Sequence, residues 1–176
     1  MSISKLGWIL VAALALTACS RGENADALFQ GQTSLEDEFA AAGALGPDGQ
    51  PLPPPSRAFF QQVIGDRVFF SVDQHQLTPE ATAGLDQQAN WLLANAAGTI
   101  TIEGHADEQG TRDYNIALSN RRAAAVRDYL VTRGVPDGRL TLVPFGKERP
   151  VEVCSTEACY SKNRRAVPVV GSAIGS

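Results

Sequence analysis

The sequence predicts an α/β fold of the α+β type, in which two main helices pack on a mixed four-stranded sheet. Two observations lead to this expectation. Short runs of β-branched and aromatic residues read as strands, and they alternate with two long segments of helical periodicity in the order β-α-β-α-β-β. The chain has 176 residues, of which 44% are hydrophobic, and this suits one globular domain with extensions. We expect the domain over residues 59–171.

The first half of the domain is expected to form a strand, a helix and a second strand. Residues 67–72 are rich in β-branched and aromatic side chains, as strands are. Thr78-Pro79-Glu80 has the pattern of an N-cap, a first-turn proline and a first-turn acid, and it predicts a helix over 79–96. Gly98 is expected to stop this helix, and residues 99–102 alternate as a half-buried strand does. The residues at helical spacing, expected to face the core, are Leu85, Ala89, Leu92, Leu93 and Ala96.

The second half is expected to form a long helix and two further strands, with a short helix between them. The helix is predicted over residues 113–133, with Gly134 as its C-cap. Strands are predicted over 140–143 and 165–170. Pro168 has no N–H to donate, so we expect the last strand to lie at a sheet edge or to carry a bulge. The expected inner face of the helix comprises Leu118, Ala125, Val126, Tyr129 and Leu130.

The first eighteen residues are typical of an export signal. Lys5 precedes an apolar run over residues 6–16, which is too short to span a membrane. Leu16-Thr17-Ala18-Cys19 resembles a bacterial lipobox, which implies a diacylglycerol and an N-acyl chain on Cys19 after cleavage before it. Ser20 follows the cysteine, and the common lipoprotein sorting rule then implies the outer membrane, with the domain in the periplasm. The alternative is an unlipidated secretory peptide with an incidental cysteine.

Residues 19–58 are predicted to be a flexible tether between the lipid and the domain. Glycines and prolines are concentrated in residues 43–55, where they interrupt regular structure and favour extended chain. We expect the folded part to act at a distance from the membrane. A processing remnant without a role is the alternative.

A candidate binding pair links the loop Gly104–Gly110 to the long helix. Asp107 lies in this loop, and Arg122 follows fifteen positions later. Arg122 falls between Leu118 and Val126 on the apolar stripe, where an arginine requires a buried or ligand-borne anion. Asp107 and Arg122 would bind the ammonium and carboxylate groups of a small zwitterion. An internal salt bridge between them is the alternative, and it is the commoner use of such a pair.

Several short motifs are distributed over residues 65–168. They are Phe69-Phe70-Ser71-Val72-Asp73, Glu103-Gly104-His105-Ala106-Asp107-Glu108, Gly110-Thr111, Tyr114-Asn115-Ile116, Leu118-Ser119, Arg121-Arg122-Ala123, Tyr129-Leu130, Gly134-Val135, Gly146-Lys147-Glu148 with Pro150, and Tyr160-Ser161-Lys162-Asn163-Arg164-Arg165-Ala166. Together they resemble the OmpA-like peptidoglycan-binding domain family. The lipobox and the tether agree with this resemblance independently.

The resemblance implies non-covalent binding of the peptidoglycan stem peptide through meso-diaminopimelate, without catalysis. It assigns that ligand to Asp107 and Arg122, and so favours the zwitterion alternative. Asp73 has a second interpretation as a cap of the following loop, and His105 is more typical of a structural hydrogen-bonding role. The further residues that match the family's site are Asn115, Leu118, Phe70, Ser71 and Asp73.

The resemblance to lipoproteins of this family also implies protein partners for this chain. These lipoproteins bind the β-propeller protein TolB and the protein TolA, and through them support envelope integrity and outer-membrane constriction at cell division. The alternative is an OmpA-like lipoprotein that tethers the envelope to the wall outside the Tol system. A flagellar stator protein shares the domain but requires a transmembrane helix, and the segment over residues 6–16 is too short for one.

The remaining cysteines, the absence of catalytic motifs and the net charge argue against an enzyme or a nucleic-acid-binding protein. If Cys19 carries the lipid, Cys154 and Cys159 are the two cysteines that remain. Export to an oxidising compartment predicts a disulfide between them. An enzyme would use His105, Asp107 and Glu108 as metal ligands or acid/base pairs, but HExxH, GxSxG and zinc-type spacings are absent from the sequence. We therefore expect no metal or other cofactor. The net charge of −4 and the lack of a basic stripe argue against nucleic acid as a partner.

Overall fold

The structure, a computed structural model, describes residues 46, 49–50, 52–53, 55–96 and 98–171. The expected signal peptide, Cys19 and most of the expected tether lie outside these residues. No helix within the described part has the length and apolar character that a membrane span requires.

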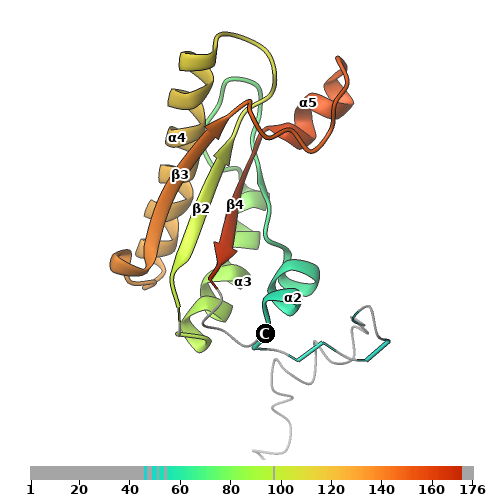
Figure 1. The fold of residues 1–176 in the computed structure, drawn as a ribbon. Coiled ribbons are helices and arrows are strands. Elements are labelled where there is room, and N and C mark those ends of the chain that lie inside the picture. The colour runs from blue at the N-terminus through green and yellow to red at the C-terminus, as the bar shows by residue number, and fades with distance from the viewer. Residues whose placement is uncertain (1–45, 47–48, 51, 54, 97, 172–176) are drawn as a thin grey trace, which may run out of the picture.

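The described chain forms four strands and six helical segments (Figure 1). In chain order they are α2 (Arg57–Phe59), the π-helix η1 (Phe60–Gly65), β1 (Val68–Phe69), α3 (Pro79–Ala94), β2 (Ile100–His105), α4 (Arg112–Thr132), the 3-10 helix η2 (Asp137–Arg139), β3 (Leu140–Gly146), α5 (Glu157–Asn163) and β4 (Arg165–Val170). The sheet order is β1-β4-β2-β3. β2 and β3 are parallel, and the other two pairs are antiparallel. The predicted mixed four-stranded sheet with two main helices is confirmed.

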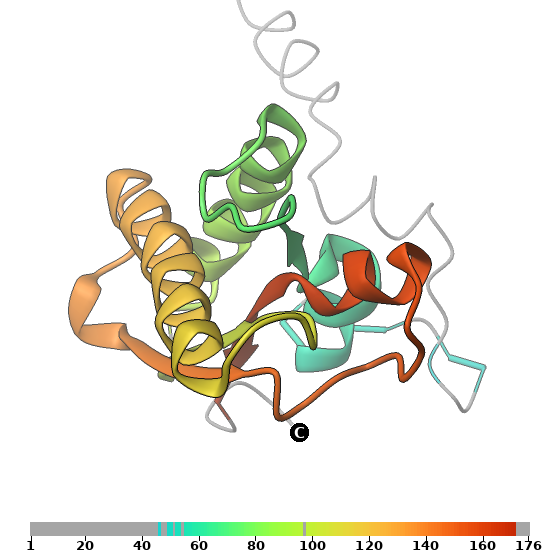
Figure 2. The same cartoon turned by 90° about the horizontal axis from the view of Figure 1, so that it is seen from above.

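The core lies between the sheet and the two long helices, which cover one face of it (Figure 2). Ile100 and Ile102 of β2 point into this core, as alternate residues of a strand do. The helix α3 is rotated slightly from the expected face, because Trp91 is buried while Leu93 is 42% exposed. The buried cluster comprises Phe59, Phe60, Val68, Phe70, Leu85, Ala89, Trp91, Leu92, Ile100, Ile102, Ala123, Val126, Leu130, Val135, Ala166 and Val170.

The ends of both long helices follow their local sequence. Thr78 and Thr111 are N-caps, and their hydroxyl oxygens accept hydrogen bonds from backbone N–H groups three residues on. At the end of α4, Gly134 adopts φ +97° and its N–H donates to Val131, while Val135 donates to the carbonyl of Leu130. These two bonds form a Schellman motif, so the predicted glycine stop of α4 is confirmed.

The position of β4 differs from the prediction made from Pro168. β4 is an inner strand, between β1 and β2, so the expectation of an edge strand is wrong. The Phe70 N–H donates to the Arg164 carbonyl, so even-numbered backbone groups of this segment face β1. β1 pairs only with Ala166 and Arg165, and because it begins at Val68, opposite Ala166, it does not extend alongside Pro168. The proline nitrogen therefore faces a side with no partner strand, and no ladder bond is lost.

β2 and β3 extend further than predicted, whereas β1 is shorter than the expected 67–72. β2 continues through Gly104 to His105, and β3 runs on to Gly146 in parallel with it. Gly104 permits α4 to approach the sheet, because a Cβ atom there would lie 2.0 Å from the backbone oxygen of Ser119. As a result, the carboxyl ends of β2 and β3, the start of α4, and α5 meet at one end of the sheet (Figure 1).

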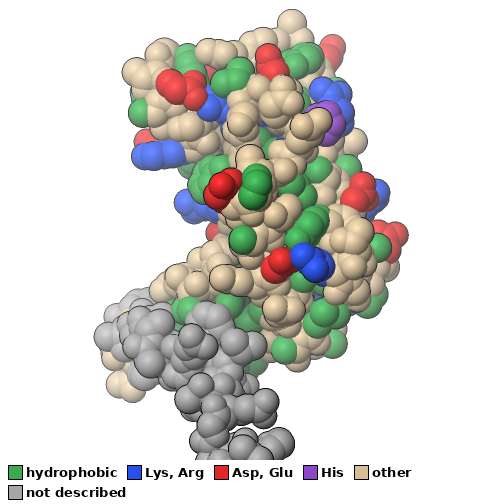
Figure 3. Space-filling view, turned by 180° about the vertical axis from the view of Figure 1, so that it is seen from behind, with side chains coloured by type: hydrophobic (Ala, Val, Ile, Leu, Met, Phe, Trp, Pro, Cys, Tyr) green, Lys and Arg blue, Asp and Glu red, His purple; other side chains and the backbone are tan. Residues whose placement is uncertain are grey.

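Charged side chains of both signs are interspersed over the face drawn in Figure 3. Several form exposed ion pairs, such as Arg133 with Asp86 and Arg112 with Glu148. Exposed pairs of this kind contribute little to stability. The apolar core therefore supplies most of the stabilisation, and the charges that matter for the site are the buried ones.

The close approach at Gly104 predicts a large effect of adding one methyl group. Gly104→Ala should lower the free energy of unfolding by about 3 kcal/mol, because the new Cβ would overlap backbone atoms that cannot rotate away. The matched control is Gly84→Ala within α3, where a Cβ meets no atom within 4 Å. That variant should gain about 0.5–1 kcal/mol from helix propensity. Urea denaturation of residues 20–176, followed by circular dichroism, measures both. Equal stabilities would contradict the close packing of α4 on β2.

Candidate functional site

Arg122 lies at the centre of this end of the sheet and is fully buried. Its guanidinium donates to three backbone carbonyls: from Nε to Gln74 at 2.8 Å, from Nη1 to His105 at 2.9 Å, and from Nη2 to Ser71 at 3.1 Å. Arginine carries five N–H groups, so two remain beyond these three bonds, one on each terminal nitrogen. The buried anion expected beside Arg122 is thus replaced, in this structure, by carbonyl dipoles.

The surroundings of Arg122 leave its charge intact. Burial lowers the pKa of Arg122 to about 10, and the nearby charges of Asp107 and Asp73 oppose this shift. The guanidinium also lies 5.3 Å from the centroid of the Phe70 ring, within the range of a cation–π contact. Arg122 is therefore still a cation at neutral pH. Leu118, one turn earlier in α4, is buried on the same face.

Asp107 is close enough to affect the pKa of Arg122, but it forms its ion pair with another arginine. One carboxylate oxygen accepts from Nη1 of Arg164 at 3.1 Å, and the other accepts from the Gln109 N–H at 3.2 Å. Asp107 is 8% exposed. The alternative of an internal salt bridge between Asp107 and Arg122 is therefore wrong, because Arg164 takes that place.

The loop that carries Asp107 is fastened near its C-terminal end by side chains from α4 and from the segment after β3. The Asn115 amide donates to the Gln109 carbonyl at 2.8 Å, and Asn115 is itself buried. The Lys147 ammonium donates to the carbonyl of Gly110 at 2.9 Å. Asn115 was expected to reach a bound peptide, but here at least one of its N–H groups orders the loop. The loop geometry is thus fixed before any ligand binds.

The turn Ser71–Gln74 covers Arg122 from the solvent side. All four of its residues are exposed, and the Gln74 N–H donates to the Ser71 carbonyl at 3.2 Å. Asp73 has φ +54°, an uncommon conformation that aspartate tolerates better than most residues. Its carboxylate accepts from the Tyr114 hydroxyl at 3.3 Å. Asp73 therefore joins the turn to α4 in this structure.

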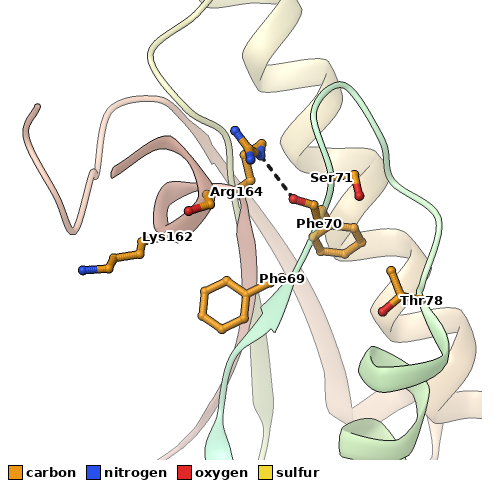
Figure 4. Close-up of a pocket in the computed structure, with 7 residues that line it drawn as sticks. Phe69, Phe70, Ser71, Thr78, Lys162 and Arg164 are labelled. Atoms are coloured by element: carbon orange, nitrogen blue, oxygen red, sulfur yellow. Dashed lines mark hydrogen bonds between the residues drawn. The ribbon is translucent and has the colours of Figure 1, made fainter. Parts of the chain in front are cut away.

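A shallow groove of about 480 Å³ lies next to this turn. Figure 4 shows Arg164 at one end of it, with the Phe69 ring and Lys162 on the α5 side. The Arg164 Nε donates to the Phe70 carbonyl, drawn as a dashed line. Asp107 and Arg122 do not line this groove. Its lining residues are Phe69, Phe70, Ser71, Thr78, Ser161, Lys162 and Arg164.

Arg164 is the residue of the site that the sequence analysis missed. It is 4% exposed, and its guanidinium also binds the Glu157 carboxylate from both terminal nitrogens. Burial acts to lower the pKa of Arg164, but the bonds with Glu157 and Asp107 outweigh it and raise that pKa. The available signal was its place in the motif Tyr160–Ala166, directly before the last strand.

His105 occupies a different role from the hydrogen-bonding one expected for it. Its ring is buried against Phe145, with 5.5 Å between ring centroids, and neither ring nitrogen has a hydrogen-bond partner. Burial, followed by the positive charges of Arg165 and Arg149, lowers the pKa of His105 to about 4. Glu103 is 3.6 Å from Nε2, too far for a hydrogen bond. The described residues contain no group of three potential metal ligands.

The predicted disulfide between Cys154 and Cys159 is present. It bridges the loop before α5 to the first turns of that helix. The buried Asn163 side chain fastens the same loop, since it accepts from the Val151 N–H and donates to the Glu152 carbonyl. Together these contacts fix the position of α5, and with it the carboxylate of Glu157.

The family model of the OmpA family matches residues 69–164, which is 96 of the 176 residues. This span contains the last residue of β1, both long helices, β2, β3 and α5, and with them Asp107, Arg122 and Arg164. The chain therefore belongs to the OmpA family.

Individual relatives agree with this membership. The peptidoglycan-associated lipoprotein of Rhizobium meliloti is 46% identical over 93% of this chain and 86% of its own length. That of Brucella melitensis is 48% identical over 75% of this chain and 79% of its own length. The crystal structure of the peptidoglycan-associated lipoprotein from Burkholderia pseudomallei superposes with a TM-score of 0.62 at 35% identity. It covers 66% of this chain and all of that one.

The burial of neutral His105 predicts a loss of stability in mild acid. A folded pKa of about 4, below the ordinary 6.5, means that the unfolded chain takes up a proton first. The stabilisation is complete above about pH 6.5 and is lost as the pH falls towards 4. From pH 7 to pH 5 the free energy of unfolding should fall by roughly 1–2 kcal/mol through this residue.

Urea denaturation at the two pH values measures this effect. His105→Phe should flatten the pH dependence, because phenylalanine can stack on Phe145 without titrating. His75→Gln is the control, since His75 is exposed, and it should keep the wild-type decline. A His105→Phe variant as sensitive to pH as the wild type would show that another group is responsible.

Proposed function

We propose that this protein binds peptidoglycan non-covalently through meso-diaminopimelate of the stem peptide, and so connects the outer membrane to the cell wall. The observation that carries this proposal is the surroundings of Arg122, within a chain that belongs to the OmpA family. Arg122 is a buried cation with two N–H groups beyond its three carbonyl bonds, and Asp107 is close enough to raise its pKa. No reaction is part of the proposal.

The chemistry of the ligand matches this pair of charges. The side chain of diaminopimelate ends in an ammonium and a carboxylate on one carbon. The two terminal nitrogens of Arg122 would donate to the carboxylate, and charge-assisted bonds of this geometry are strong. The Asp107 carboxylate would accept from the ammonium. A neutral or singly charged side chain would lack at least one of these two charge-assisted contacts, which is the basis of selectivity.

Access to Arg122 requires the turn Ser71–Gln74 to move. The turn is exposed, and its contacts with Arg122 are two single hydrogen bonds from the guanidinium. A ligand carboxylate at the two terminal nitrogens would be a stronger, charged acceptor that offsets the loss of these carbonyl bonds. Phe70, Ser71 and Asp73 would then border the bound ligand, as their place in the family motif suggests, while Asn115 and Leu118 support it from α4.

The proposal includes the membrane side of the connection. A diacylglycerol and an N-acyl chain on Cys19 would place the protein in the outer membrane, with the domain in the periplasm. The relatives named as lipoproteins support this location. TolB and TolA are the proposed protein partners, in a Tol-Pal system that acts in envelope integrity and cell division. A wall-tethering lipoprotein outside that system is the alternative, and co-purification with TolB would distinguish the two.

Sedimentation with purified peptidoglycan tests the proposed site. Residues 20–176 of the wild type should sediment with the wall, while Asp107→Asn and Arg122→Lys should lose at least tenfold in affinity. Each variant removes one charged, partly buried contact, which is worth roughly 1.5–3 kcal/mol. Asp128→Asn and Arg127→Lys, an exposed pair on α4, are matched controls and should bind as the wild type does.

Folding must be measured in the same variants, because Arg122 also bonds three backbone carbonyls. Circular dichroism and thermal unfolding show whether each remains folded at the assay temperature. Folded variants that sediment as well as the wild type would contradict the assignment of the ligand to Asp107 and Arg122. A wild type that stays in solution would contradict peptidoglycan binding itself.

Membrane fractionation of cells tests the lipid anchor. The full chain should fractionate with the outer membrane, and Cys19→Ser should be released, because two or more acyl chains are needed for stable anchoring. Labelling with radioactive palmitate measures the acylation directly. An unlabelled wild type in the soluble periplasm would contradict lipidation and favour the unlipidated secretory alternative.

A further inference from the structure

Arg164 is a second buried cation near Arg122, and a carboxylate of this chain, that of Glu157, is already bound to it. Its Nε and Nη1 bind the Phe70 carbonyl and Asp107, which orient the guanidinium. The Glu157 carboxylate accepts from Nη1 and Nη2, in the two-bond arrangement that arginine forms with a carboxylate. Arg164 is buried and lines the groove, whereas the Glu157 side chain is 66% exposed.

We propose that Glu157 is an internal competitor, and that a second carboxylate of the stem peptide displaces it from Arg164. This inference rests on the proposed function, because the same peptide provides both charged groups. Its zwitterionic residue would bind at Asp107 and Arg122, and a neighbouring carboxylate along the peptide would bind at Arg164. Arg164 is then a further binding residue of the site.

The contacts of Glu157 suit displacement. Hydrogen bonding to Arg164 lowers the pKa of Glu157, so it is charged at neutral pH. Apart from Glu157, Asp107 is the carboxylate bound to Arg164. Removing Glu157 therefore leaves two N–H groups of the Arg164 guanidinium in need of an acceptor. Glu157 is the exposed partner of this pair, so water solvates its carboxylate once it leaves Arg164. A ligand carboxylate restores both bonds, and the fold loses almost nothing.

The shape and charge of the groove indicate where that carboxylate would come from. Ser71 lines the groove and bonds Arg122 through its carbonyl, so the groove and the zwitterion site share a wall. Lys162, five residues beyond Glu157 in α5, lines the same groove and carries a second positive charge, which is paired with Glu152. Phe69, 50% exposed, provides an apolar side. A short acidic peptide that reaches from one arginine to the other fits these features.

Two synthetic peptides test the proposal by isothermal titration calorimetry. Both are L-Ala-γ-D-Glu-meso-diaminopimelate, with the α-carboxylate of the glutamyl residue either free or converted to the carboxamide. Wild-type protein, residues 20–176, contains every described residue and should bind the free acid more tightly than the amide. Glu157→Gln should bind the free acid about two- to fivefold more tightly than wild type, with the amide unchanged.

Two further variants separate competition from a structural role. Arg164→Lys, which cannot form the two-bond arrangement, should lose the preference for the free acid. Glu148→Gln is the matched control, since Glu148 is an exposed acid paired with Arg112 that does not line the groove, and it should behave as wild type. Thermal unfolding of each variant confirms that it is folded in the assay.

The outcomes distinguish this inference from the function on which it rests. Wild-type binding with equal affinities for the two peptides overturns the Arg164 site alone. Weaker binding by Glu157→Gln shows that Glu157 orients Arg164 rather than competes, and also overturns it. Failure of the wild type to bind either peptide overturns the proposed function, and this inference with it.

Discussion

The bonds from Arg122 to three backbone carbonyls are the constraint on which this end of the molecule depends. The carbonyls belong to Ser71, Gln74 and His105, so one side chain of α4 joins the turn after β1 to the end of β2. A buried guanidinium without acceptors would be costly. The fold meets this cost with three backbone carbonyls, which accept from the guanidinium in place of a buried anion.

The two buried arginines of the site have different partners and different roles. Asp107 is paired with Arg164, so it does not neutralise Arg122, and the Arg122 charge stays available to a ligand. Had Asp107 paired with Arg122 directly, a zwitterion would have to break that bond before it gained either of its own. The arrangement through Arg164 keeps the acid oriented and desolvated, and leaves only the neutral carbonyls of Ser71 and Gln74 to be displaced from Arg122. Preorganisation of this kind lowers the cost of binding.

Local sequence predicted the helices well because their signals are local. Thr78 and Gly134 act on backbone groups within a few residues, and the structure follows them. Strand lengths were less predictable. β2 continues into Gly104 and His105 because β3 pairs with it, and that partner is 40 residues away. The edge position inferred from Pro168 was wrong for a similar reason, since the length of β1 decides which backbone groups of β4 need partners.

The same distinction explains which parts of the site the sequence revealed. Arg122 was correctly predicted to be a buried charge from its place on the apolar face of α4. Helical periodicity fixes which face of a helix a residue occupies. The partners of Arg122 were not predictable, since a backbone carbonyl has the same chemistry at every residue and leaves no mark in the sequence. Arg164 was overlooked because it comes directly before β4, and its role depends on Asp107, which is 57 residues earlier. A charge site assembled from segments this far apart becomes visible only in the folded chain. Here Ser71 connects its two arginines, since its carbonyl accepts from Arg122 and it lines the groove with Arg164.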